Sequence, residues 1–174
     1  MNKLRSHLLP LSVNLALFFI LYIAHYSGVF SIKIMNANPL TPLALLVAVC
    51  MFSKETTATF TGLTLGIFMD AVSSDSSVIY TVTLFIAALA VALTVHYYFN
   101  NNIRSAITLC ILACVFVFLV RWFFFHALQS SLDTSLKHLL YYVIPSIIYT
   151  SVFVIPFYYL EQLLHRNIQR DNFR

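Results

Sequence analysis

Long apolar segments separated by short polar turns are the dominant feature of this 174-residue sequence. A helix that crosses the hydrocarbon core of a bilayer needs about 20 mostly apolar residues. No stretch between the apolar segments is long enough for a soluble domain. We therefore predict an all-α integral membrane protein, a six-transmembrane-helix bundle that forms a single transmembrane domain over residues 1–174. The expected helices cover residues 8–30, 39–52, 55–72, 78–99, 103–128 and 139–160.

Composition excludes a soluble globular protein. Hydrophobic residues make up 60% of the chain and charged residues only 9%, whereas soluble domains carry about 25% charged residues. The three cysteines, Cys50, Cys110 and Cys114, lie inside apolar segments. An odd number of cysteines in such places does not describe a disulfide framework, so we expect them to be small packing residues.

The first apolar segment follows Lys3 and Arg5, as the apolar core of a signal peptide would. It is too long for such a core, and no A-x-A cleavage site follows it. We expect a retained first helix.

Basic residues predict the orientation of the bundle. With six spans, the N-terminus, the turns at 53–56 and 100–104, and the C-terminus share one side of the membrane. Cytoplasmic segments carry an excess of Lys and Arg, so we predict that both termini are cytoplasmic. That side holds Lys3, Arg5, Lys54, Arg104, Arg166, Arg170 and Arg174, and the opposite side holds Lys33 and Lys137.

Two charged residues fall at similar depth near the outer ends of their predicted helices. Asp70 follows Lys54 by about 24 Å of helix, and Arg121 follows Arg104 by about 25 Å. An ionisable residue at membrane depth is a candidate functional site. We hypothesise that Asp70 and Arg121 pair, or share a small polar cluster with His126. The alternative is that each side chain extends separately to the headgroups.

Gly62, Gly66 and Asp70 form a row at intervals of four residues. Small residues at this spacing let the backbone of another helix approach closely inside lipid. Two alternatives are open for the helix that packs there. It belongs to the same chain, or it belongs to a separate protein.

No pattern in the sequence predicts catalysis. The six histidines are scattered, and no Ser-His-Asp arrangement, phosphate-binding loop or H-E-x-x-H motif is present. A small membrane enzyme would need a nucleophile–base pair or a metal cluster. We expect no enzymatic activity, no cofactor, no metal and no nucleic-acid binding. Contact with membrane lipid is expected, and the basic end "LLHRNIQRDNFR" is either a further lipid contact or a short solvated tail.

Residues 39–95 resemble the MreD family of bacterial rod shape-determining proteins. In that family a proline opens the second helix, and a G-x-x-x-G-x-x-x-D row on the third helix precedes a turn of small residues and another apolar helix. Pro39, Gly62, Gly66 and Asp70 occupy those places here. The turn departs from the family pattern, because "AVSSDSSV" carries serines where glycine is usual.

The resemblance implies a non-enzymatic scaffold of the bacterial cytoplasmic (inner) membrane. Its implied partners are the single-span protein MreC and other members of the cell-elongation complex, namely MreB, RodA and the penicillin-binding partner of RodA. The implied role is to hold MreC and peptidoglycan synthesis together and so maintain cell shape, with the row at Gly62, Gly66 and Asp70 shaping the contact.

The family also resembles the substrate-binding subunits of vitamin importers in its six-helix fold. Such a subunit is the alternative function. It would need an A-x-x-x-A face on the first helix, whereas Ile20 lies between Ala16 and Ala24 here.

Overall fold

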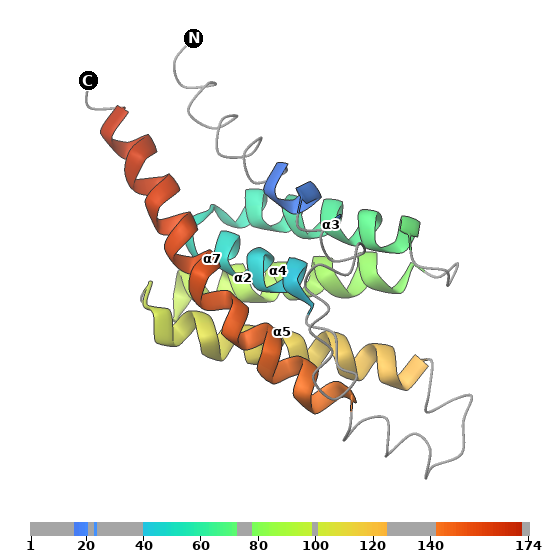
Figure 1. Cartoon of the computed structure of the whole chain (residues 1–174). Helices are drawn as coiled ribbons and strands as arrows, with labels where there is room; N and C mark the ends of the chain where they lie inside the picture. The colour runs from blue at the N-terminus through green and yellow to red at the C-terminus, as the bar shows by residue number, and fades with distance from the viewer. Residues whose placement is uncertain are drawn as a thin grey trace.

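The computed structural model describes residues 16–20, 23, 40–72, 78–98, 101–124 and 142–171, and all regular structure in these ranges is helical. Five helices carry labels in Figure 1: α2 (Thr41–Phe52), α3 (Glu55–Val72), α4 (Ile79–Tyr97), α5 (Ile103–Trp122) and α7 (Ile144–Asp171). Three helices are long and apolar enough to cross a membrane, namely α4, α5 and residues Ile144–Arg166 of α7. The prediction of an all-helical membrane protein is thus confirmed.

The short helix α2 is the core of the bundle. All residues from Thr41 to Met51 are buried, and α3, α4, α5 and α7 pack around them (Figure 1). A helix that is apolar on every side is stable only when it is enclosed. With 12 residues it spans about 18 Å, less than the thickness of the hydrocarbon core, so its neighbours must shield its ends.

The structure differs from the sequence prediction at the last helix. We predicted that the helix ends at residue 160, but α7 continues to Asp171. The residues that follow Leu160 are mostly Leu, Gln, Glu and Arg, which favour helix although several are polar. The loss of hydropathy after residue 160 therefore does not mark the end of the helix.

Other predicted boundaries lie close to the observed ones or outside the described residues. Helix α3 covers the predicted range, and α4 is three residues shorter than predicted. Of the first predicted helix, only residues 16–20 and 23 are described, and they are helical. The six-helix count and the orientation of the termini remain predictions.

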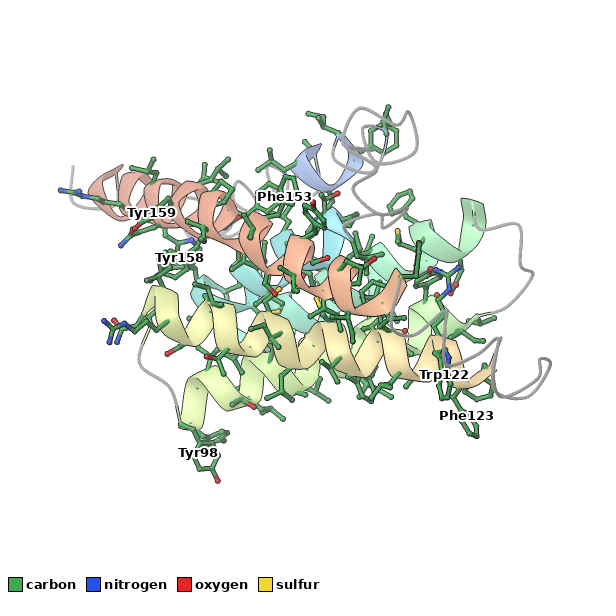
Figure 2. The ribbon with its side chains drawn as sticks, turned by 60° about the horizontal axis from the view of Figure 1, so that its bottom comes forward. Tyr98, Trp122, Phe123, Phe153, Tyr158 and Tyr159 are labelled. Atoms are coloured by element: carbon green, nitrogen blue, oxygen red, sulfur yellow. The ribbon has the colours of Figure 1, made fainter. Side chains whose placement is uncertain are left out.

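Large apolar side chains cover the outside of the bundle. Leu112 on α5, Ile148 on α7 and Val82 on α4 are 64%, 61% and 53% exposed. Aromatic side chains gather at both ends, with Tyr98, Tyr158 and Tyr159 toward one end and Trp122 and Phe123 at the other (Figure 2). An apolar surface between two aromatic belts is typical of a protein that spans a bilayer.

Candidate functional site

Asp70 lies at the end of α3 and caps the neighbouring helix α4. Its Oδ1 accepts a hydrogen bond from the Tyr80 N–H at 3.0 Å. Its Oδ2 accepts bonds from the N–H of Thr81 at 2.7 Å and from the Thr81 hydroxyl at 2.5 Å. The first N–H groups of a helix have no acceptor within the helix. Val78, at the N-cap position of α4, supplies none from its side chain, so the acceptor comes from another helix.

The two glycines of the row also face α4. A Cβ added at Gly66 would collide with the Cα of Thr81, and one added at Gly62 would collide with the Cβ of Ala88. Real Cβ atoms do not approach so closely, so only glycine allows this separation between the two helices. Close backbone approach and the Asp70 cap together join α3 to α4, the helix pair with the most extensive contact in the bundle.

The glycine row is therefore filled by a helix of the same chain. The sequence left open whether the packing helix belongs to the same chain or to a separate protein, and in the structure it belongs to the same chain. A groove for a separate protein does not fit this face of α3, because α4 occupies it. Any partner must contact a different surface.

Arg121, at the end of α5, reaches the same place from the other side of α4. Its guanidinium carbon lies 4.9 Å from the centroid of the Tyr80 ring, and this ring is buried. Because the Arg121 side chain is only half-buried, such a cation–π contact is worth about 1 kcal/mol. Tyr80 thus links the two charged residues of the hypothesised pair, through its N–H to Asp70 and through its ring to Arg121.

A direct ion pair between Asp70 and Arg121 stays a prediction. His126, the third member of the expected cluster, lies outside the described residues. The C-terminal ends of α3 and α5 and the N-terminal end of α4 thus meet at Tyr80.

A contact between His96 and Glu55 links the opposite ends of α3 and α4, and it is an ion pair only when His96 is protonated. His96 Nδ1 lies 3.7 Å from Glu55 Oε1, and both side chains are substantially exposed. An exposed pair of this kind contributes roughly 0–1 kcal/mol. The α3–α4 pair is thus connected at both ends, strongly by Asp70 and weakly by Glu55.

The cysteines pack as expected within the described part of the bundle. Cys50, Cys110 and Cys114 are all buried free thiols. The Sγ atoms of Cys110 and Cys114 lie 3.9 Å apart, and Cys50 Sγ lies 3.8 Å from the carbonyl oxygen of Ala88. Among the described residues, no group of three His, Cys, Asp or Glu side chains is placed to hold a metal ion.

Polar contacts of α7 were missed by the sequence reasoning. The N–H of Leu40, at the start of α2, donates to Thr150 Oγ1 at 3.0 Å in a buried position. Tyr158 donates from its hydroxyl to the Asn101 carbonyl at 2.9 Å. Glu161 is only 1% exposed. A few polar residues in an otherwise apolar helix could have indicated buried polar contacts. Their spacing does not identify the residues that they contact.

The residues of this site hold α3 and α4 in place relative to each other. The Asp70 carboxylate is engaged by three donors of α4, and the glycines serve close packing. Comparisons with protein-family models, with curated proteins and with solved structures found no match for this chain.

Proposed function

We propose that the protein is a non-enzymatic scaffold of the bacterial cytoplasmic membrane that acts in cell elongation in the manner of the MreD family. The observation that supports this proposal is the α3–α4 unit. The resemblance depends on Gly62, Gly66 and Asp70, and these residues act together in one structural feature that joins two helices rigidly. A rigid helix pair without a reactive group suits a scaffold.

The proposed contact surface for MreC is the exposed side of α3 beside the groove that Phe60 forms with Phe85 and Leu89 of α4. Phe60 and Ile67 lie there, two turns apart, and are 67% and 54% exposed. Helix association inside lipid depends on side-chain packing, and these two residues offer a bulky ridge to a single membrane-spanning helix. The scaffold then holds MreC beside RodA and its penicillin-binding partner, with MreB on the cytoplasmic side.

Co-purification from native membranes in mild detergent tests both parts of the proposal. The variant Phe60→Ala/Ile67→Ala alters the proposed surface, and Ile148→Ala/Val152→Ala alters two equally exposed residues of α7 as a matched control. We expect the tagged wild type and the control to recover MreC, and the α3 variant to lose it while it still elutes as a folded protein.

The other outcomes separate the function from the surface. Failure of the wild type to recover MreC would contradict the scaffold function. Recovery of MreC by the α3 variant would leave the function in place and show that the surface is wrong. Recovery of an ATP-driven transport module in place of MreC would favour the importer alternative.

A further inference from the structure

An apolar groove of about 230 Å³ runs along the outer surface between α4 and α5. The two helices are antiparallel neighbours, so residues of one face residues of the other in reverse order. The groove extends from Thr94 and Thr108 at one end to Ile86 and Phe116 at the other, with Leu112 between them. Eight residues of helix on each side give it a length of about 12 Å. Leu112 is 64% exposed, so the groove opens to the surrounding lipid.

A basic side chain and a phenol lie at the threonine end of this groove. Arg104 is exposed and lies one helical turn before Thr108, whose hydroxyl donates to the Arg104 carbonyl. Tyr98 lies one turn after Thr94, is 85% exposed, and is directed away from the bundle at the end of α4 (Figure 2). None of the described residues forms an ion pair with Arg104.

The charge at this end of the bundle is mainly positive. Lys54, Arg104 and Arg166 are exposed, and the acidic side chain of Glu55 is next to His96. Of the two acidic residues at this end of α7, Glu161 is buried and Asp171 is the last residue of the helix. A hydrocarbon-sized groove thus ends at a cationic, hydrogen-bond-donating rim.

We propose that this groove binds an anionic phospholipid. One acyl chain lies between α4 and α5, the phosphate of the headgroup pairs with the Arg104 guanidinium, and the Tyr98 hydroxyl is a second donor. The planar fork of an arginine side chain matches the oxygens of a phosphate. This site is separate from the Asp70 cap and does not depend on the proposed function.

The size of the groove favours an acyl chain over a protein helix. An apolar cavity of about 150 Å³ accommodates a benzene ring, so the volume here suits a slender hydrocarbon segment. A partner helix is about 10–12 Å wide and would place only one or two side chains into a space of this volume, whereas an acyl chain can lie along its whole length.

Thermal unfolding of the purified full-length protein in a neutral detergent tests the site. The probes are phosphatidylglycerol, phosphatidylcholine with the same acyl chains, and glycerol phosphate. We expect phosphatidylglycerol to raise the unfolding temperature in a saturable way, phosphatidylcholine to act only at much higher concentration, and glycerol phosphate to have no effect. An equal effect of phosphatidylcholine, or an equal effect of glycerol phosphate, would overturn the proposal.

Three variants locate the effect. Arg104→Gln removes the charge and should weaken phosphatidylglycerol binding about five-fold or more. Ala90→Phe fills the groove and should abolish the shift. Lys137→Gln removes a basic residue that is predicted to lie on the opposite side of the membrane, and this variant should bind as the wild type does. Wild-type binding by Arg104→Gln, a surface change that leaves the core intact, would contradict the proposal.

Native mass spectrometry of protein extracted from its own membrane distinguishes the occupants. We expect a retained mass of an anionic phospholipid that is lost from Arg104→Gln. A retained polypeptide in place of the lipid, lost from Ala90→Phe, would show that the groove is a protein contact and would overturn the proposal.

Discussion

Asp70 is a carboxylate at the end of an apolar helix, and its three hydrogen bonds to the first turn of α4 account for its place there. Asp70→Ala should lower the free energy of unfolding by roughly 1–3 kcal/mol, because partly buried donors would lose a charged acceptor. Asp70→Asn keeps one acceptor oxygen and should lose less. Unfolding in detergent measures both variants, and wild-type stability of Asp70→Ala would contradict the capping role.

The two glycines differ in what a side chain would meet, and this difference is testable. At Gly62 the closest atom is the side-chain Cβ of Ala88, whereas at Gly66 it is the backbone Cα of Thr81. Overpacking of this kind costs typically 1–3 kcal/mol. We expect Ala88→Gly to restore part of the stability lost in Gly62→Ala and none of that lost in Gly66→Ala. Rescue of both variants, or of neither, would show that the contacts are not as described.

At the scale of helices, the start of α2 depends on a single hydroxyl of α7. The Leu40 N–H is buried and donates to Thr150 Oγ1, which in turn donates to the Ser146 carbonyl. Thr150→Val has the same shape but no acceptor, and leaving a buried donor without a partner costs about 1–3 kcal/mol. The matched variant Thr150→Ser keeps the hydroxyl. In the same unfolding assay we expect Thr150→Val to lower the free energy of unfolding and Thr150→Ser to lower it much less. Equal losses in the two variants would contradict this role of the hydroxyl.

The sequence predicts where helices begin and end along the chain better than it predicts which helices pack against each other. The bounds of α3 follow from the apolar run that begins after Lys54. The extra length of α7 was not predicted, because the last turns of this helix are polar. A row of small residues predicts close packing but carries no information on which helix packs there. Two of the three donors to Asp70 are backbone N–H groups of α4, and backbone groups leave no trace in a residue pattern.

For the molecule as a whole, the orientation in the membrane is a prediction that the chain makes easy to test. Its cysteines are buried, so they should give little background in labelling with a membrane-impermeant thiol reagent. Seven basic residues against two predict cytoplasmic termini. A cysteine introduced at Lys33 or Lys137 should react in intact cells, and one introduced at Arg174 should react only after permeabilisation. The reverse pattern would invert the predicted topology.

The exposed apolar surfaces and the joined helices α3 and α4 are the features that support the proposed scaffold function. The most direct test of that account is cell shape after controlled depletion of the protein in a rod-shaped bacterium that encodes it. We predict that cells lose their rod shape and become round as the protein disappears, and that wild-type protein restores rods. Cells that remain rods after complete depletion would contradict a role in elongation, whatever the protein binds.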